Sequence, residues 1–452
     1  MSYSLAMLTD FYQLTMAQGY WRLGKHKQRA IFDLFFREAP FHGTYAIFCG
    51  LESVLNAIAK FSFQEADIAY LASLKTNNKK PLFDTKFLTS LVDLQLTVDI
   101  DAVIEGTLVF PKEPLLRVSG PIWECQLLES ILLNLINFPT LIATKAARVC
   151  YAAKGDPVLE FGLRRAQGEN GALTASRAAF IGGVCATSNL LAGQCYGIPV
   201  VGTHAHSWVM AFDNELEAFE SYAEVMPSNC IFLVDTYNTL QGVKNAIQVA
   251  RSLQEKGFNL LGIRLDSGDL VALSILAREL LDAADLKNVQ IVGSSDLDEY
   301  AIEDFKNKGA QISRWGVGTR LVTAYDQPAL GGVYKLVAIQ NAKNQWQYKT
   351  KITEDKGKKM LPGVYNVRRY SANGKFTHDV LYDSNILQKE HQPEEPYEEL
   401  LIPICRKGKL IAQSPPLQAI RERALDQLQK LPEELKALKS SNRYPVVVEG
   451  DL

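Results

Sequence analysis

Two histidines one residue apart form the first candidate site for chemistry. They are His204 and His206, in the segment Gly202-Thr203-His204-Ala205-His206-Ser207, and the chain of 452 residues has six histidines in all. The apolar run 198–201 before them is typical of a buried strand, and residues 208–225 after them are typical of a helix. A histidine between a strand and a helix is placed to act on a phosphate group, a metal ion or a proton.

This spacing allows three interpretations. On an extended backbone His204 and His206 project to one face, as a metal pair does in barrel hydrolases. That site needs further ligands from later strands, and no histidine lies between His206 and His378, which weakens the interpretation. One histidine could instead act as a nucleophile toward phosphate, with Asp235, at the end of the next predicted strand, placed to orient its ring. A histidine that only forms a hydrogen bond at a helix start is the third interpretation.

A second candidate site is the segment Arg264-Leu265-Asp266-Ser267-Gly268-Asp269. Arg264 and Asp266 lie two residues apart, so both face the same side if the strand persists. An arginine can fork onto a carboxylate or a phosphate, and an aspartate can hold ribose hydroxyls or Mg²⁺. A buried structural pair between Arg264 and Asp266 is the alternative.

Basic and glycine-rich segments after two other predicted strands could bind phosphate. Arg164 and Arg165 follow the run 158–161, and at most one of them faces a ligand if that strand continues. A surface ion pair is the alternative for either, and the sequence does not decide which one faces a substrate. Gly316 and Gly318, in Gly316-Val317-Gly318-Thr319, would let backbone N–H groups approach a phosphate, with the hydroxyl of Thr319 as a further donor. An ordinary tight turn is the alternative there.

The elements that must position these residues form a regular strand-then-helix pattern from about residue 157. Helical patterns are expected at 174–191, 215–225, 239–256, 270–284 and 296–308, between apolar runs at 158–161, 198–201, 231–234, 260–265, 289–292 and 312–317. Each of the six predicted strands ends in a cluster of polar or glycine residues. A barrel brings the carboxyl ends of all its strands to one face, whereas an open doubly wound sheet concentrates such residues at one point. The pattern therefore favours an α/β barrel.

The segments on either side of this pattern are different. Residues 8–23 are expected to form a helix that carries Tyr12, for which packing is the first interpretation and stacking on a flat ligand the second. Strands are expected at 30–36 and within 97–118, and helices within 127–149 on both sides of Pro139. Hairpin-like pieces at 365–370 and 378–381 and a charged helix at about 416–438 are expected near the C-terminus.

Composition excludes several classes of protein. The apolar fraction is 47%, and the formal net charge is −2, so neither disorder nor electrostatic binding to nucleic acid or to an anionic membrane is expected. The seven cysteines contain no Cys-x-x-Cys pair and fit free thiols in a reducing compartment. Neither a run of about 18 apolar residues nor a leader segment is visible. A soluble, cytoplasmic protein is therefore expected.

Taken in chain order, these motifs resemble those of the nicotinate phosphoribosyltransferase family. The resemblance covers about three-quarters of the chain, and only its motifs taken together are specific. The matching segments are Thr9-Asp10-Phe11-Tyr12-Gln13, Phe36-Arg37-Glu38-Ala39-Pro40-Phe41, residues 160–168, residues 202–207, residues 262–269, Gly316-Val317-Gly318-Thr319 and residues 330–337.

The resemblance implies a fold and a reaction. The fold is an irregular α/β (TIM-like) barrel of the type II phosphoribosyltransferases, with an N-terminal mixed α/β domain at 1–122, the barrel at 123–337, and a C-terminal segment at 338–452 that packs on the N-terminal domain or on a partner subunit. The reaction joins nicotinate to phosphoribosyl pyrophosphate, giving nicotinate mononucleotide and pyrophosphate, coupled to ATP hydrolysis. The resemblance also implies a homodimer with its active site near the subunit interface. It implies a role for Mg²⁺, whose ligands are not identified. Neither nucleic acid nor a membrane is expected as a partner.

The resemblance also implies roles for residues. His206 matches the histidine that the family phosphorylates, whereas His204 falls at a variable position, and Asp235 is similar to the aspartate that holds the phosphorylated ring. Tyr12, Thr203 and Arg264 match contacts to nicotinate. A phosphoribosyl site is implied at Arg164 or Arg165, Asp266, Gly316, Gly318 and Thr319.

Three other functions are compatible with parts of the sequence. A sister enzyme could use nicotinamide, which has no carboxylate, or quinolinate, which has two, with the same donor. A hydrolase with a metal ion at His204 and His206 belongs to another class, as does a non-catalytic phosphosugar-binding protein.

Overall fold

The structure, a computed structural model, describes residues 4–350, 362–384 and 396–449. Contacts between residues divide the chain into two compact units: Met1–Leu141 with Ala329–Leu452, and Ile142–Pro328. The predicted domain boundaries, between residues 122 and 123 and between residues 337 and 338, stay predictions. The two compact units are defined by contacts, and such units need not coincide with domains.

The second unit contains six parallel strands in the order β7-β6-β11-β10-β9-β8. Their bounds are Val158–Glu160 (β6), Ala186–Thr187 (β7), Ile231–Leu233 (β8), Gly262–Leu265 (β9), Gln290–Gly293 (β10) and Arg314–Val317 (β11). The strands at the two ends of this part of the chain, β6 and β11, pair with each other. The edges of the sheet, β7 and β8, approach the segment 199–203: Val200 forms a parallel bridge with Thr187, and the Thr203 hydroxyl donates to the carbonyl oxygen of Ile231.

This arrangement confirms the predicted irregular α/β barrel, and the structure adds that the barrel is incompletely closed, because β7 and β8 do not pair. The strand expected at 198–201 is reduced to the single bridge at Val200, and the short strand β7 was not predicted. The expected helix 174–191 is wrong: α7 ends at Ile181, and α8 covers Leu190–Tyr196. The helix ends there because Gly183 adopts a φ of 117°, which is in the left-handed region.

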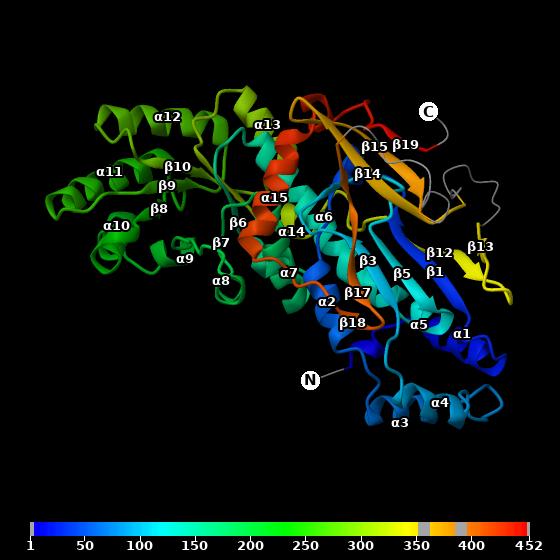
Figure 1. The fold of residues 1–452 in the computed structure, drawn as a ribbon. Coiled ribbons are helices and arrows are strands. Elements are labelled where there is room, and N and C mark those ends of the chain that lie inside the picture. Colours follow the sequence, from blue (N-terminus) through cyan, green and yellow to red (C-terminus); the bar gives the residue numbers. More distant parts are fainter. Residues whose placement is uncertain (1–3, 351–361, 385–395, 450–452) are drawn as a thin grey trace. The chain divides into compact units, whose positions relative to one another are not determined.

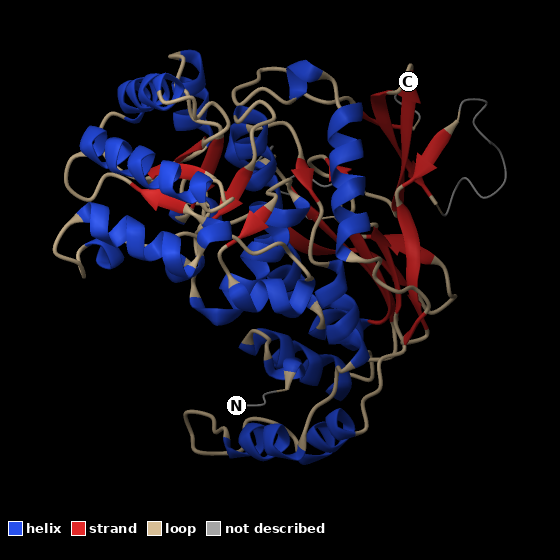
Figure 2. Ribbon diagram, turned by 90° about the vertical axis from the view of Figure 1, so that its left-hand side faces the viewer, coloured by secondary structure: helices blue, strands red, loops and turns tan. Residues whose placement is uncertain are grey.

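Helices cover the outside of the barrel sheet. Figure 1 shows α10, α11 and α12 along strands β8 to β10, and Figure 2 shows helices around these strands from a second direction. The bounds are Gly168–Ile181 (α7), His206–Val209 (α9), Glu215–Val225 (α10), Thr239–Glu255 (α11), Leu270–Ala283 (α12), Glu299–Asn307 (α13) and Thr319–Val322 (α14). The predicted helix 208–225 is two helices, α9 and α10, since the Asn214 side chain caps a new helix by accepting from the Glu217 backbone N–H.

Alternation along the strands sends functional side chains inward. In β11, Trp315 is fully buried and its indole N–H donates to Asp156, while Arg314, one residue earlier, lines a cavity within the barrel. In β9, Ile263 and Leu265 are buried, while Arg264 lines the same cavity. Successive side chains of a strand point to opposite faces, so the inward residues of neighbouring strands form one wall.

The first unit is built on a seven-stranded sheet of order β13-β12-β1-β5-β3-β17-β18, in which the paired strands are antiparallel. These strands are Arg29–Phe36 (β1), Asp99–Val103 (β3), Leu116–Pro121 (β5), Gly332–Gln340 (β12), Trp346–Tyr348 (β13), Leu401–Arg406 (β17) and Lys409–Leu410 (β18). Strand β17 pairs with β3, so C-terminal residues extend the sheet of N-terminal residues. A two-stranded sheet joins β2 (Ala46–Ile47) to β4 (Leu108–Val109).

A four-stranded sheet, β16-β14-β15-β19, completes the strands of this unit. It contains the expected hairpin as β14 (Tyr365–Ala372) and β15 (Lys375–Asp383), with β16 (Tyr397–Glu399) and β19 (Val446–Val448) at its edges. The helices of the unit are Phe11–Arg22 (α1), Leu51–Ala59 (α2), Glu65–Ser73 (α3), Thr85–Val92 (α4), Ile122–Leu127 (α5) and Leu417–Lys430 (α15).

Helix α6 runs without a break from Glu129 to Ala152, so the predicted interruption at Pro139 is wrong. Proline removes the N–H that would bond to the carbonyl of Leu135, four residues earlier. Gly50 lies against that carbonyl, where an added Cβ would be only 2.1 Å from the oxygen. This helix is long and apolar enough to cross a membrane, but 67% of its most apolar window is buried inside the protein, as in the core helix of a soluble protein.

Candidate active site

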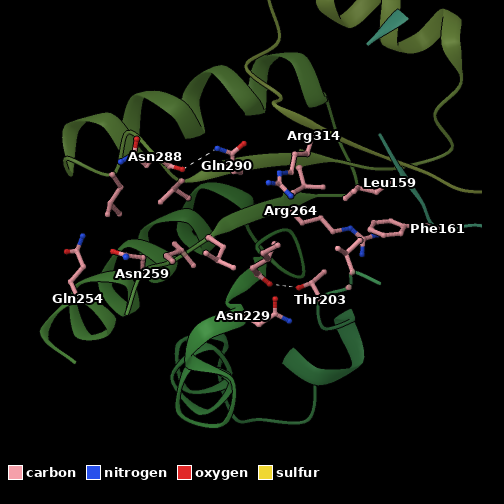
Figure 3. Close-up of a pocket in the computed structure, with 18 of the residues that line it drawn as sticks. Leu159, Phe161, Thr203, Asn229, Gln254, Asn259, Arg264, Asn288, Gln290 and Arg314 are labelled. Carbon is pink, nitrogen blue, oxygen red and sulfur yellow. Dashed lines mark hydrogen bonds between the residues drawn. The ribbon is translucent and has the colours of Figure 1, made fainter. Parts of the chain in front are cut away.

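A cavity of about 500 Å³ lies inside the barrel. At one end it is lined by Phe161, Thr203 and Arg264, and at the other end by residues that precede the strands, including Asn259 and Asn288. Figure 3 shows these side chains around the cavity, together with the hydrogen bond of Thr203. Cavities of this size are typical of small-molecule sites, and the carboxyl ends of the strands are the usual place for an active site in a barrel.

Arg264 is held by a small polar network at the carboxyl end of β9. Its Nη2 donates to Asp266 Oδ1 at 2.7 Å, and its Nε donates to the hydroxyl of Ser294 at 2.7 Å. The Ser294 hydroxyl in turn donates to Asp266 Oδ1. The guanidinium also lies 5.5 Å from the centre of the Phe161 ring, within cation–π distance. The same-side prediction for Arg264 and Asp266 is therefore confirmed, and the two residues form an ion pair in this state.

His206 lies beside this network at the N-terminus of α9. Its Nδ1 is 3.1 Å from the hydroxyl of Thr236, and its Nε2 is 4.0 Å from Asp266 Oδ2. The side chain is 40% exposed, so a ligand can reach it. With Nδ1–H donating to Thr236, the lone pair of the neutral ring lies on Nε2, the atom that faces Asp266.

Asp235 contacts the loop after β9, where a contact with His206 was expected. Its Oδ2 accepts from the backbone N–H of Asp266 at 2.9 Å and from the hydroxyl of Ser267 at 2.6 Å. Its Oδ1 is buried without a hydrogen-bond partner in the described part of the chain. The residue that orients the unmodified imidazole is Thr236, which follows Asp235 directly.

His204 faces away from the site. Its ring is 7% exposed and packs against Phe219, Tyr222 and Phe232, with ring centres 5.1 to 6.2 Å away. Its Nε2 accepts from the backbone N–H of Leu233 at 3.3 Å. Burial lowers the pKa of this ring to about 4, so it is neutral at neutral pH.

The metal-pair interpretation is therefore wrong, because His204 uses Nε2 within the protein core. Its Nδ1 lies 3.4 Å from the carbonyl oxygen of Ala205. Among the residues that the structure describes, no three or more His, Cys, Asp or Glu side chains are grouped to hold a metal ion.

The two arginines after β6 lie in a 3-10 helical turn, Leu163–Arg165. Strand β6 ends at Glu160, so the condition under which only one arginine would face a ligand is not met, and both Arg164 and Arg165 are exposed. Neither forms an ion pair with a described residue, so the alternative of a surface ion pair is not observed. A buried carboxylate holds the preceding turn, since Glu160 accepts from the backbone N–H of Gly162 and from the hydroxyls of Ser176 and Thr187.

The glycine-rich segment at the end of β11 has one buried glycine, Gly316, and two partly exposed residues, Gly318 and Thr319. Gly316 is buried, and an added Cβ would lie 2.8 Å from the ring of Phe161, so this glycine makes room for the aromatic wall behind Arg264. Gly318 precedes Thr319, the first residue of α14, and both are partly exposed. Among the described residues, no hydrogen bond joins Thr319 to Arg264. Tyr12, on α1 of the first unit, is 47% exposed.

Thr236, Ser294 and Glu160 were not predicted as functional residues. Thr236 and Ser294 belong to the polar clusters that follow predicted strands, whereas Glu160 lies within the apolar run 158–161. Only their type, a hydroxyl or carboxylate near a carboxyl end, could have indicated them. The contacts that give them a role depend on the register of neighbouring strands, which pairs Val292 with Arg264 and so brings Ser294 beside Asp266.

Three family models match the chain in order. A nicotinate phosphoribosyltransferase N-terminal domain matches residues 7–137, the nicotinate phosphoribosyltransferase family matches residues 157–381, and a nicotinate phosphoribosyltransferase C-terminal domain matches residues 378–452. A protein from Bacillus subtilis (strain 168) named nicotinate phosphoribosyltransferase is 42% identical over 469 aligned positions, covering 99% of this chain and 94% of the relative. One of the same name from Homo sapiens is 35% identical and covers 99% and 95%.

Solved structures agree with these matches. The crystal structure of human nicotinic acid phosphoribosyltransferase superposes with a TM-score of 0.83 at 33% identity, covering 98% of each chain. A nicotinate-nucleotide pyrophosphorylase from Pyrococcus furiosus shares the fold, with a TM-score of 0.73 at 24% identity over 94% of this chain and 95% of that one. The chain belongs to the nicotinate phosphoribosyltransferase family.

Proposed function

We propose that this chain transfers the phosphoribosyl group of phosphoribosyl pyrophosphate to nicotinate, giving nicotinate mononucleotide and pyrophosphate. The observation that carries the proposal is that His206, at the start of α9, lies beside Asp266 and Arg264 at the carboxyl end of β9, next to a cavity sized for a small ligand. Family membership supports the same reaction.

The proposed chemistry is a displacement at the ribose. The ring nitrogen of nicotinate forms a bond to C1 of the ribose, and the bond from C1 to the pyrophosphate oxygen breaks. Positive charge develops on the ribose as pyrophosphate leaves, and the carboxylate of Asp266 would offset this charge or bind the ribose hydroxyls. Arg264 and Thr203 would bind the nicotinate carboxylate, and Tyr12 would stack on its ring.

Phosphate groups of the donor would be bound at the ends of β6 and β11. Arg164 and Arg165 are exposed and form no ion pair with a described residue, which leaves their positive charge available. Thr319 and the backbone at Gly316 and Gly318 would supply neutral donors. The close packing of Gly316 against Phe161 makes Gly318 the more accessible of these two glycines.

We further propose that His206 couples the transfer to ATP. Its Nε2 would form a bond to the γ-phosphorus of ATP as the bond to the β,γ-bridging oxygen breaks and ADP leaves. Thr236, which holds Nδ1 of the same ring, supports this role because it leaves the Nε2 lone pair free. Hydrolysis of the phosphohistidine to phosphate would then complete the cycle. Asp235, with one buried carboxylate oxygen unpartnered among described residues, would contact the modified ring or its loop.

Magnesium fits this arrangement as a companion of the diphosphate. Mg²⁺ is commonly bound through one or two carboxylates together with substrate phosphates, which agrees with the unpartnered Oδ1 of Asp235 and the accessible carboxylate of Asp266. The ion would neutralise charge on the leaving pyrophosphate.

A homodimer and a cytoplasmic location remain predictions, to be tested by sedimentation of the full chain and by cell fractionation.

One assay tests the proposed reaction. Release of pyrophosphate and of the mononucleotide is measured with nicotinate, nicotinamide and quinolinate, each with and without ATP. We expect turnover with nicotinate and stimulation by ATP. Preference for nicotinamide or quinolinate would instead identify a sister activity, and chelator-sensitive hydrolysis without a need for phosphoribosyl pyrophosphate would identify a hydrolase.

A substitution tests the ATP coupling. His206→Asn is expected to lose both stimulation by ATP and acid-labile ³²P incorporation from [γ-³²P]ATP. His204→Gln is the matched control, since His204 lies in the core, and it should still incorporate label. Full ATP stimulation in His206→Asn would show that another residue is phosphorylated.

A further inference from the structure

The barrel cavity has a second inward arginine that the proposed reaction does not use. Arg314 is the first residue of β11 and lines the cavity together with Arg264 of β9. Strand β10 lies between them, and its residue Val292 is in register with both arginines. The two arginines therefore lie level on the same wall, two strand spacings apart, or about 10 Å between backbones. Figure 3 shows both side chains in the cavity wall.

The two arginines differ in how their charge is balanced. Arg264 is paired with Asp266 at 2.7 Å and bound to Ser294. Arg314 forms no ion pair and no side-chain hydrogen bond with any described residue, and its Nε is buried without a partner. A buried donor without a partner is costly, and a native structure usually satisfies it with a water molecule or a ligand. Arg314 is thus the uncompensated cation of this cavity.

The surroundings of Arg314 define the chemistry of a ligand. We call the part of the cavity between Arg314 and the starts of the strands the lower cavity; besides Arg314 it is lined by Asn229, Asn259, Leu261, Leu286, Asn288 and Val289. Its walls are aliphatic and its rim carries neutral amides, with Asp285 as the one acidic residue among the cavity-lining residues. An apolar body with a single negative charge fits such walls around a free guanidinium.

The volume of the cavity indicates that the lower cavity is separate from the proposed nicotinate position. The cavity of about 500 Å³ falls in the range of sites for drug-sized molecules, whereas nicotinate is one ring with one carboxylate. A single such molecule held at Arg264 and Thr203 leaves the lower cavity open to another ligand.

We propose that the lower cavity is a separate binding site for a small carboxylate with an apolar body, and that Arg314 forks onto its carboxylate. The site is reached from the side of the barrel where the strands begin, because Asn259, Leu261 and Asn288, which precede β9 and β10, lie on its rim and are exposed. This inference does not depend on the transferase activity.

Benzoate is a suitable probe because it has the carboxylate and the apolar ring but no ring nitrogen to accept a ribose. Isothermal titration calorimetry of the full chain, without phosphoribosyl pyrophosphate, should show that benzoate binds. Benzamide, which lacks the carboxylate, should bind with lower affinity. Arg314→Gln should raise the Kd for benzoate by about 10-fold to 100-fold, which is the effect of losing hydrogen bonds to a charged group. Arg251→Gln is the matched control, an exposed arginine on α11 outside the cavity.

Two further variants separate this site from the nicotinate position. Leu261→Trp should block the rim and weaken benzoate binding without removing any charge, whereas Arg264→Gln should leave Arg314 able to bind benzoate. Unaltered affinity in Arg314→Gln, no measurable binding by the wild type, or loss of binding in Arg264→Gln alone would each overturn the inference. Failure of the proposed function would show separately, as absence of nicotinate turnover in a protein that still binds benzoate.

Discussion

Lowering the pH should destabilise the barrel through His204. This ring is 7% exposed, packs against three aromatic side chains, and accepts a hydrogen bond from Leu233 through Nε2. Burial lowers its pKa from 6.5 to about 4. Protonation would remove the acceptor and place a positive charge among apolar rings.

The sign and size of the effect follow from linkage. The unfolded chain, with a histidine pKa near 6.5, binds more protons than the folded chain between pH 6.5 and 4. The contribution of His204 to the free energy of unfolding is therefore complete above pH 6.5 and is lost as the pH falls toward 4. At 1.36 kcal/mol for each step of one in pKa, the full loss is about 3 kcal/mol.

Two measurements check this prediction. Titration of isotope-labelled histidines by NMR gives the pKa of His204 directly, assigned by its absence in His204→Gln. Urea unfolding at several pH values between 7.5 and 4.5 should show a shallower pH dependence in His204→Gln than in the wild type, whereas Tyr222→Phe, which alters the same aromatic cluster, should keep the wild-type dependence. A directly measured pKa near 6.5, or equal pH dependence in wild type and His204→Gln, would refute the reasoning.

Two substitutions probe the residues that orient the proposed catalytic groups. Ser294→Ala removes the hydroxyl that binds Arg264 and should raise KM for nicotinate about 10-fold, the effect of a hydrogen bond to a charged group, while Ser295→Ala next to it should not. Thr236→Val removes the partner of His206 Nδ1 and should slow phosphorylation by ATP in a single turnover about 5-fold, with Thr236→Ser restoring the rate. An unchanged KM in Ser294→Ala would show that Ser294 does not position Arg264, and an unchanged phosphorylation rate in Thr236→Val would show that Thr236 does not position His206.

The barrel could be predicted from sequence because its strands and helices repeat strong local patterns. Helix α10 covers residues 215–225, where a helical pattern was predicted, and β6, β8, β9, β10 and β11 each fall on a predicted apolar run. The errors occur where non-local contacts decide. Helix α6 passes through Pro139, and the carbonyl that the proline leaves without its N–H partner packs against Gly50, far away in the chain. A strand as short as β7 has too few residues to show a period.

The residue types of the candidate site could be read from the sequence, but their contacts could not. Placing Arg264 and Asp266 on one side needed only the period of a strand. Separating His204 from His206 needed the turn at Ala205, after which His206 begins a helix while His204 remains in the core. The role of Thr236 depends on which of two adjacent side chains at the end of β8 turns toward the ring, and no sequence pattern fixes that choice.

The distance between His206 and Asp266 suggests how phosphorylation would act on the substrate site. A phosphoryl group on Nε2 would add negative charge near Asp266 Oδ2, which lies 4.0 Å from Nε2 in the unmodified protein. Two like unit charges at that distance repel by about 4 kcal/mol at an effective dielectric constant of 20, before further screening of these partly exposed groups. Asp266 would then hold its other oxygen more firmly against Arg264 or share a bound cation with the phosphoryl group. Either response changes the charge presented to nicotinate and the ribose, so the state of His206 would be transmitted to substrate binding through a single carboxylate.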